Sequence, residues 1–325
     1  MENLPKIELH VHLDCCLSYD FVAKRRKISH EDFIKNFVAG DSCSSLTDHL
    51  SFVRNELELL QTEVDLRDAI IDLFNQFKSD NVIYAEIRFC PLLHSEKGLT
   101  PEEVVKILND AIIECQELYN IEANLILATL REYSPEQSQL IYDLAKKNKH
   151  KKVVAIDLAS DEIKYGIGNH IGIYKLAMLD NVNRIAHAGE VKGPESVWET
   201  IENLNPSRIG HGVKSIEDSK LIDYLIEKKI HLEVCPSSNL KSKIYPNLKE
   251  HPINELYKRG VSVGINTDGR TMTYTTLNNE YQNLINVFGW EKADFLKCNI
   301  NSISASFLDN DKKERYIKQL INSYR

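Results

Sequence analysis

The side chains best suited to chemistry in this sequence are four histidines and an aspartate, each at the end of a short apolar run or close after it. His10 and His12 are separated by one residue, so on a β-strand both would point to the same side. His187, His211 and Asp268 end or closely follow three later runs. Neutral imidazole nitrogens together with a carboxylate suit a borderline divalent ion, above all zinc. These residues therefore predict a metal centre.

Two residues are candidates for activating or orienting a water molecule beside such an ion. Glu190 lies three residues after His187, and a carboxylate near an activated water can accept and return protons when burial tunes its pKa. His211 lies between Gly210 and Gly212, which let the backbone approach closely. It either binds the ion or orients the attacking hydroxide. Without a metal nearby, Glu190 would be an ordinary surface carboxylate.

Eight short runs rich in apolar and β-branched residues could position these side chains. The expected strands are residues 6–12, 82–89, 122–128, 153–158, 184–188, 208–210, 231–235 and 262–266. Turn residues and then helical spacing follow the runs, which predicts a (β/α)8 barrel with reactive groups at the C-terminal ends of its strands. A doubly wound open sheet is the competing fold, but the sequence has no G-x-G-x-x-G motif.

Two stretches exceed the simple repeat of strand and helix. Between residues 19 and 81, helical patterns at 46–60 and 64–77 predict extra helices over the mouth of the barrel, where they would form a lid. Helical patterns at 277–288 and 311–323 predict further helices after the last strand. We expect residues 1–325 to form a single barrel domain.

The amino-acid composition argues against a nucleic acid or a membrane as the partner of this protein. The 40 Lys and Arg residues against 48 Asp and Glu give a net charge of −8, and 42% of residues are hydrophobic. This balance is typical of a globular protein and argues against a nucleic-acid partner, which would need clustered basic residues. With no secretory signal and no run of about 18 apolar residues, we expect a cytoplasmic protein with no membrane partner. The seven cysteines contain no C-x-x-C pair, so reduced thiols are expected. The oligomeric state is left open.

Six short segments stand out by their order and spacing. They are residues 6–14 (KIELHVHLD), 157–162 (DLASDE), 187–190 (HAGE), 208–212 (RIGHG), 235–239 (CPSSN) and 266–268 (NTD). They resemble the motifs of the adenosine deaminase branch of the metal-dependent amidohydrolases, and the resemblance covers nearly the whole chain. It implies a (β/α)8 barrel that holds one zinc ion through four ligands, His10, His12, His187 and Asp268.

The same resemblance implies roles for three further residues. Glu190 would be the proton shuttle, His211 would position the attacking hydroxide, and Asp14 would contact the ribose side of the substrate. The implied reaction, a step of purine salvage, is hydrolytic deamination of adenosine, and also of 2′-deoxyadenosine, to a 6-oxopurine nucleoside and ammonia. Hydroxide would attack C6 of the purine while protonated Glu190 donates to N1.

Other functions remain open at this point. Adenine, N6-methyl-AMP or another 6-aminopurine compound would use the same zinc and Glu190, although Asp14 would repel a 5′-phosphate. A non-catalytic nucleoside-binding protein is an alternative of another class, but it would not need the proton-transfer residues. A two-metal hydrolase of cyclic amides is a third, but the expected strand at residues 153–158 has no lysine at its tip.

Three sites depart from the family pattern. Cys15 and Cys16 replace a Gly-Ala pair, and we expect small packing residues there, with a stray metal ligand as the alternative. Ser160 stands where relatives have a glycine whose backbone N–H meets purine N3, and serine keeps that donor unless the position needs a positive φ. Gly269 stands where many relatives carry a second aspartate that contacts purine N7.

The loss of that aspartate raises the question of which residue recognises N7. Arg270 and Thr271 follow Gly269 directly, and both carry hydrogen-bond donors. We expect one of them to supply the missing contact. The alternative for Arg270 is an ordinary solvated loop charge.

Overall fold

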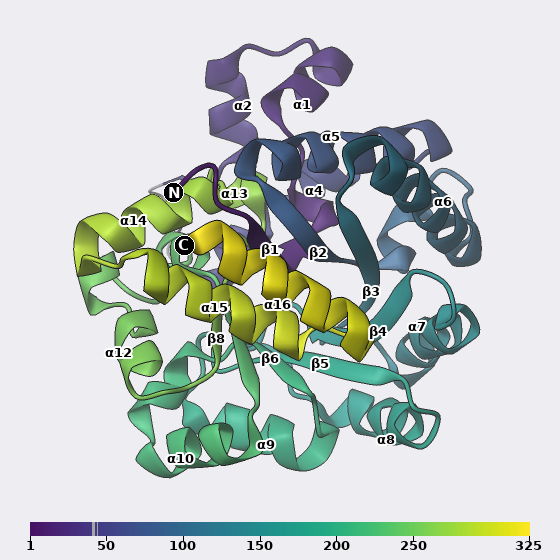
Figure 1. Cartoon of the computed structure of the whole chain (residues 1–325). Helices are drawn as coiled ribbons and strands as arrows, with labels where there is room; N and C mark the ends of the chain where they lie inside the picture. The colour runs from purple at the N-terminus through teal and green to yellow at the C-terminus, as the bar shows by residue number, and fades with distance from the viewer. Residues whose placement is uncertain (41–42, 44) are drawn as a thin grey trace.

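The computed structural model describes residues 1–40, 43 and 45–325. Eight parallel strands follow one another in chain order around a barrel (Figure 1). They are β1 Lys6–His12, β2 Val82–Phe89, β3 Glu122–Leu130, β4 Val153–Ala159, β5 Asn183–Ala188, β6 Arg208–His211, β7 His231–Val234 and β8 Val263–Ile265. The predicted (β/α)8 barrel is confirmed, and each predicted strand is present with ends that differ by at most two residues.

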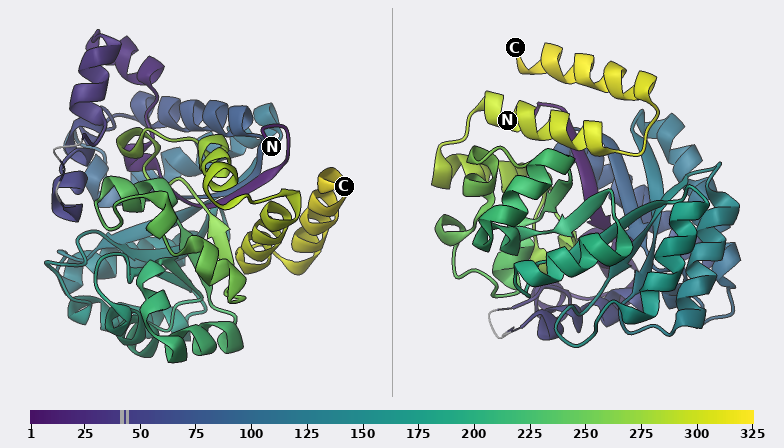
Figure 2. Two further views of the ribbon diagram at one scale, coloured as in Figure 1. Left: turned by 90° about the vertical axis from the view of Figure 1, so that its left-hand side faces the viewer. Right: turned by 90° about the horizontal axis from the view of Figure 1, so that it is seen from below.

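Helices cover the outside of the barrel (Figures 1 and 2). This layer contains α5 Glu63–Asp80, α6 Pro101–Tyr119, α7 Pro135–Asn148, α8 Ile171–Leu179, α9 Pro194–Leu204, α10 Ser219–Lys228 and α12 Ile253–Lys258. Helices α6 and α7 begin at a proline after the capping residues Thr100 and Ser134, whose side chains accept hydrogen bonds from the backbone of the first turn. Among the described helices, none combines the length and the apolar character that crossing a membrane requires.

The extra helices predicted between the first two strands are present. They are α1 Tyr19–Arg26, α2 His30–Phe37, α3 Leu46–Leu50 and α4 Val53–Leu57, followed by α5. The pattern over residues 46–60 does not form one helix, because the chain turns at Ser51 and Phe52 between α3 and α4. Positions 41, 42 and 44 of this predicted lid lie outside the described residues.

The C-terminal third adds short helices and a terminal pair. The short helices are α11 Pro236–Lys241 and α13 Arg270–Thr273. The 3-10 turns are spread along the whole chain: η1 Leu13–Cys15, η2 Pro91–His94, η3 Gly168–His170, η4 Val213–Glu217 and η5 Leu248–Glu250. The predicted helices at 277–288 and 311–323 are α14 Leu277–Phe288 and α16 Asn310–Tyr324, while α15 Lys292–Ala305 was not predicted.

Helices α15 and α16 lie together at the N-terminal end of the barrel (Figure 2). The Asn299 side-chain oxygen of α15 accepts a hydrogen bond from the backbone N–H of Ile7 at 2.8 Å. The Ala305 carbonyl accepts one from Arg208 at 3.1 Å. This end of the barrel is therefore covered, and the opposite end carries the candidate site.

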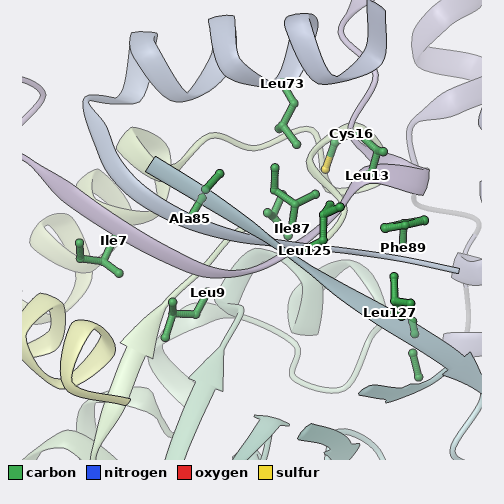
Figure 3. Packing of buried hydrophobic residues seen from close by; sticks show 14 of the residues in the cluster. Ile7, Leu9, Leu13, Cys16, Leu73, Ala85, Ile87, Phe89, Leu125 and Leu127 are labelled. Atoms are coloured by element: carbon green, nitrogen blue, oxygen red, sulfur yellow. The ribbon is translucent and has the colours of Figure 1, made fainter. Parts of the chain in front are cut away.

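Alternation along the strands separates an apolar face from a charged interior. Ala85 and Ile87 of β2 belong to the hydrophobic core, and Leu73 of α5 lies over Ile87 (Figure 3). Glu86 and Arg88, which alternate with them along β2, are fully buried and pair with residues of strands across the barrel. The strands are mostly apolar, but their charged residues point into the barrel lumen and form ion pairs there.

The barrel closes between β1 and the segment after β8. The backbone N–H of Asp268 donates to the His10 carbonyl at 2.9 Å, and the N–H of His12 donates to the Asp268 carbonyl at 3.2 Å. The segment that carries the predicted aspartate ligand is therefore held beside the strand that carries two of the predicted histidines.

Candidate functional site

The four predicted metal ligands converge at the C-terminal end of the barrel. His12 Nε2 lies 3.3 Å from His187 Nε2 and 3.4 Å from Asp268 Oδ1. His10 Nε2 lies 3.5 Å from the same Asp268 oxygen. We call these four residues the pocket floor. Their close approach matches what the strand-end positions predict.

Carboxylates behind the floor contact the Nδ1 atoms of His10 and His187 and so orient these two rings. His10 Nδ1 lies 3.0 Å from Glu233 Oε2, and His187 Nδ1 lies 3.1 Å from Asp157 Oδ2. A carboxylate at Nδ1 places the proton on that nitrogen and leaves the lone pair of Nε2 free for a metal. Burial lowers the pKa of His12 well below its ordinary value, which favours the neutral imidazole.

These donors fit a zinc ion. His10 Nε2 is fully buried and has no hydrogen-bond partner in the part of the chain that the structure describes. Such a nitrogen is costly to bury unless something accepts its lone pair. Candidate ligand atoms of His10, His12 and His187 all lie within 4.8 Å of one another. Ser238 donates to Asp268 Oδ2 at 2.7 Å and so orients the carboxylate.

A buried ion-pair network supports the floor from inside the barrel. The guanidinium of Arg88 donates to Asp157 at 2.7 Å and to Glu233 at 2.5 Å, so one cation holds both carboxylates that orient histidines. Arg208 donates to Glu233 at 2.6 Å. Sequence reasoning missed Arg88, Arg208 and Glu233 as supporting residues. The available signal was a charged residue inside a predicted buried strand, which requires a partner.

A second group of possible ligands overlaps the first. It consists of His10, His211, Cys235 and Asp268. Burial raises the pKa of the Cys235 thiol well above its usual value, and its sulfur donates to the Glu233 carbonyl at 3.5 Å. A neutral thiol is a poor metal ligand, which favours the three histidines over the group that contains Cys235.

Glu190 and His211 lie beside the floor. Glu190 Oε2 is 3.7 Å from His211 Nε2. Burial, with the nearby charges of Asp268 and Glu162, raises the pKa of Glu190 well above its usual value, which favours the protonated carboxyl. Glu162 also accepts backbone hydrogen bonds from residues 189–192 at 2.8 to 3.3 Å, and it thereby holds the loop that carries Glu190.

Three site residues adopt left-handed backbone conformations that favour glycine. The φ angles are 85° at Ser160, 60° at His211 and 63° at Asp268. Such conformations cost about 1–2 kcal/mol each for a residue with a Cβ and recur at functional sites. From the sequence we expected Ser160 to keep its backbone N–H as a donor to purine N3, provided that this position does not need a positive φ. The observed φ of Ser160 is positive, so that condition is not met.

A pocket opens directly above the floor. Its lining residues are His12, Cys15, Leu46, His49, Leu50, Ser160, His187, Glu190, His211, Asp268 and Met272. We call Leu46, His49 and Leu50 of α3, together with Met272 of α13, the pocket wall. Part of the predicted lid thus lies over the predicted ligands. Sequence reasoning missed His49, a polar residue within a helix pattern of apolar positions.

The expected N7 contact by Arg270 or Thr271 is wrong for this structure. Arg270 is buried, not solvated, and its guanidinium pairs with Glu8 at 2.5 Å and with Asp80 at 2.7 Å. The Thr271 hydroxyl donates to the Leu17 carbonyl at 2.7 Å. Both donors are already used away from the pocket.

The structure explains the glycine at position 269. A Cβ placed on Gly269 would meet the Cys15 Cβ and the Met272 methyl group, each at 3.0 Å. Cys15 and Met272 therefore occupy the space that a side chain at 269 would need. Cys15 and Cys16 are buried free thiols and join no candidate metal group among the described residues, in keeping with packing roles.

Asp14 lies outside the pocket lining. Its Oδ1 is 2.7 Å from His94 Nε2, and its Oδ2 accepts the backbone N–H of Cys90 at 3.1 Å. The structure therefore does not bring Asp14 to the other predicted site residues, and its contact with a ribose stays a prediction.

Comparisons with known proteins agree with this geometry. An adenosine deaminase from Clostridium perfringens is 36% identical over 324 residues, which span 96% of this chain and 97% of the relative. A solved adenine deaminase from Arthrobacter aurescens matches with a TM-score of 0.90 at 25% identity and covers 98% of each chain. A solved amidohydrolase from Burkholderia ambifaria, with bound Zn, has a TM-score of 0.90 at 23% identity over 99% of this chain and 91% of its own. The family model described as adenosine deaminase matches residues 5–323, so this chain belongs to the adenosine deaminase family.

Proposed function

We propose that this chain is a zinc-dependent aminohydrolase that converts adenosine, and 2′-deoxyadenosine, to the 6-oxopurine nucleoside and ammonia. The observation that carries the proposal is a buried Glu190, with its pKa raised well above the usual value, next to three histidines and an aspartate at one end of a barrel. Family membership supports the same reaction. We also propose that residues 1–325 act as one catalytic unit, and that the seven free thiols suit the reducing cytoplasm.

His10, His12, His187 and Asp268 would hold the zinc ion. When bound, zinc acts as a Lewis acid that lowers the pKa of a water molecule to about 7 and makes a nucleophile available. Arg88 would keep His10 and His187 oriented through Glu233 and Asp157. This arrangement fixes the ligands before substrate enters.

Glu190 would move the protons. Its carboxyl group donates its proton to N1 of the purine as the nucleophilic oxygen bonds to C6, which relieves negative charge on the ring. The resulting carboxylate takes the proton released by the nucleophile and passes it to the 6-amino group, which leaves as ammonia. Glu190 then takes the second proton of the water from the C6 hydroxyl as the 6-oxo group forms, so that water and adenosine give inosine and ammonia and Glu190 ends protonated as it began.

Adenine is the second candidate substrate, and a specific observation favours it. Asp14 is absent from the pocket lining, and its two oxygens contact His94 and the Cys90 backbone, so the observed geometry does not direct this carboxylate at a ribose hydroxyl. The structural relative from Arthrobacter aurescens is named an adenine deaminase. A free base would need no contact from Asp14.

Ammonia release from a panel of substrates tests the proposal. The zinc-loaded enzyme is assayed with adenosine, 2′-deoxyadenosine, adenine, AMP and N6-methyl-AMP, with Glu190→Gln as the inactive control. We expect kcat/KM to be highest for the two nucleosides. A preference for adenine would replace the first candidate by the second, and no turnover of any compound by the loaded enzyme would contradict both.

A further inference from the structure

A buried chain of hydrogen bonds runs from the backbone to His211. The N–H of Ile253 donates to His251 Nδ1 at 3.2 Å, and His251 Nε2 lies 3.0 Å from Asn239 Oδ1. Asn239 Nδ2 lies 3.2 Å from His211 Nδ1. All four residues are buried, so bulk water does not compete for these contacts.

The backbone amide sets the direction of the whole chain. An amide N–H can only donate, so His251 Nδ1 must accept. Burial lowers the pKa of His251 to about 3, which keeps the ring neutral with its single proton on Nε2. That N–H donates to the Asn239 oxygen, and the Asn239 amino group is left to donate to His211 Nδ1.

We infer that His251 and Asn239 are positioning residues that hold His211 as the tautomer with its proton on Nε2. This N–H is the atom that faces the site, 3.7 Å from Glu190 Oε2 and 3.9 Å from Asp268 Oδ2. In this tautomer His211 donates a hydrogen bond at the reaction centre and has no lone pair there.

Two chemical consequences follow. His211 stabilises negative charge on the attacking oxygen and leaves proton transfer to Glu190. A protonated Nε2 also cannot bind a cation, which removes His211 from the metal ligands and leaves His10, His12, His187 and Asp268. The catalytic part of this inference rests on the proposed function, whereas the tautomer itself does not.

Nitrogen-15 NMR of histidine-labelled protein tests the tautomer directly, with and without zinc and in the absence of substrate. We expect the His211 resonances of the wild type to report Nε2–H. The same result is expected for His251→Gln, because a glutamine amide can still donate to Asn239. Nδ1–H at His211 in the wild type would overturn the inference. A correct tautomer in a protein without deaminase activity would contradict only the proposed function.

Two substitutions separate this role from a merely structural one. His251→Leu removes the donor, and Asn239→Asp presents a carboxylate that accepts from His211 Nδ1 and reverses the tautomer. We expect both to lower kcat by about 10- to 100-fold with a much smaller change in KM, and Asn239→Asp to shift the NMR signature to Nδ1–H. Asn247→Asp, in an exposed turn, is the matched control. Wild-type kcat in Asn239→Asp, or an unchanged tautomer in it, would contradict the inference.

A separate observation concerns the pocket wall. His49 of α3 lines the pocket and is only 2% exposed, yet neither of its ring nitrogens has a hydrogen-bond partner within the described ranges. The other residues of the wall are apolar: Leu46 and Leu50 have no hydrogen-bonding side chain, and the Met272 sulfur is only a weak acceptor. A buried imidazole without a partner is unfavourable unless a ligand supplies one.

We propose that His49 hydrogen-bonds the substrate from the wall and helps to determine specificity. Burial lowers the pKa of His49, so the ring is neutral and offers one donor and one acceptor. This chemistry suits a neutral heterocycle or a sugar hydroxyl better than a phosphate. The proposal rests on the proposed function only for the identity of the substrate.

Substrate analogues identify the contact. His49→Phe is compared with wild type on adenosine, 7-deazaadenosine, 2′-deoxyadenosine and 5′-deoxyadenosine, each analogue altering one polar position. We expect KM for adenosine to rise by about 10-fold with kcat little changed, and the effect to vanish for the analogue that lacks the bonded atom. His150→Phe, at an exposed position, is the control. An unchanged KM for adenosine, or an equal rise for every analogue, would overturn the proposal.

Discussion

Three side chains of the pocket floor, His10, His187 and Asp268, have partners that orient them, whereas His49 on the pocket wall has no hydrogen-bond partner among the described residues. On the floor, Glu233 orients His10, Asp157 orients His187, and Ser238 orients Asp268. On the wall, His49 sits among apolar residues without a hydrogen-bond partner in the described parts of the chain. The floor is therefore preorganised for an ion, and the wall is completed only by what enters the pocket.

The largest effect is expected from a substitution that removes proton transfer and leaves the pocket floor intact. Glu190→Gln keeps the shape of the side chain but cannot pass a proton from the nucleophile to the leaving amine. We expect kcat for adenosine to fall by about 1,000-fold or more, with zinc content unchanged. Steady-state kinetics together with metal analysis measure both. Wild-type turnover in this variant would remove Glu190 from the mechanism.

A second substitution tests whether the floor depends on the ion pairs beneath it. Glu233→Gln keeps an acceptor for His10 but leaves Arg88 and Arg208 without a shared carboxylate. We expect zinc affinity to fall by about 10- to 100-fold and the free energy of unfolding to fall by about 3–5 kcal/mol.

Chelator competition and denaturant unfolding measure these two quantities. Glu227→Gln is the control, because Glu227 pairs with Lys228 on the surface and should change stability by no more than about 0.5 kcal/mol. Equal effects of the two substitutions would contradict a supporting role for the network.

A third substitution, at the buried carboxyl group of Glu280, tests how the stability of the protein depends on pH. Burial raises the pKa of Glu280 to about 7, and its Oε1 accepts the Ser237 backbone N–H at 3.3 Å. Because the folded state holds this proton more tightly than the unfolded state, stability is full below about pH 4.5 and falls as pH rises to about 7. Glu280→Gln should abolish that fall, which amounts to about 3 kcal/mol.

Chemical unfolding of the metal-free protein between pH 4.5 and 8 measures the difference between wild type and Glu280→Gln. The two curves should separate progressively up to about pH 7 and then run parallel. Curves that stay parallel across the whole range would show that Glu280 ionises in the folded state as easily as in the unfolded chain.

The smallest expected effect concerns the left-handed residue that lines the pocket. Ser160→Gly removes the Cβ at a φ of 85° and should raise the free energy of unfolding by about 1 kcal/mol. Ser160→Ala keeps the Cβ and is the matched control, with little change expected. Thermal unfolding of both variants checks this, and an equal response would mean that the strain lies elsewhere.

The floor could be predicted from sequence because its signals are local. Each ligand ends a strand or follows it closely, and parallel strands in a barrel bring their C-terminal ends together. The spacing of His10 and His12 places both on one face of β1. To predict that these residues meet in space, it was enough to recognise eight strands and therefore a barrel.

The supporting network and the wall could not be predicted in this way. Arg88 pairs with carboxylates on β4 and β7, and a single sequence does not show which charges face one another across a lumen. Arg270 follows Gly269 directly, yet α13 carries its side chain back to Glu8 and Asp80. Adjacency in sequence was therefore a poor guide to the direction of a side chain.

The central claim is that one zinc ion binds between His10, His12, His187 and Asp268. Anomalous diffraction at the zinc absorption edge, from crystals of the zinc-loaded protein, tests it most directly. The account predicts a single peak within bonding distance of the three histidine Nε2 atoms and an Asp268 carboxylate oxygen. A peak ligated by His211 and Cys235, or no peak at the C-terminal end of the barrel, would contradict it.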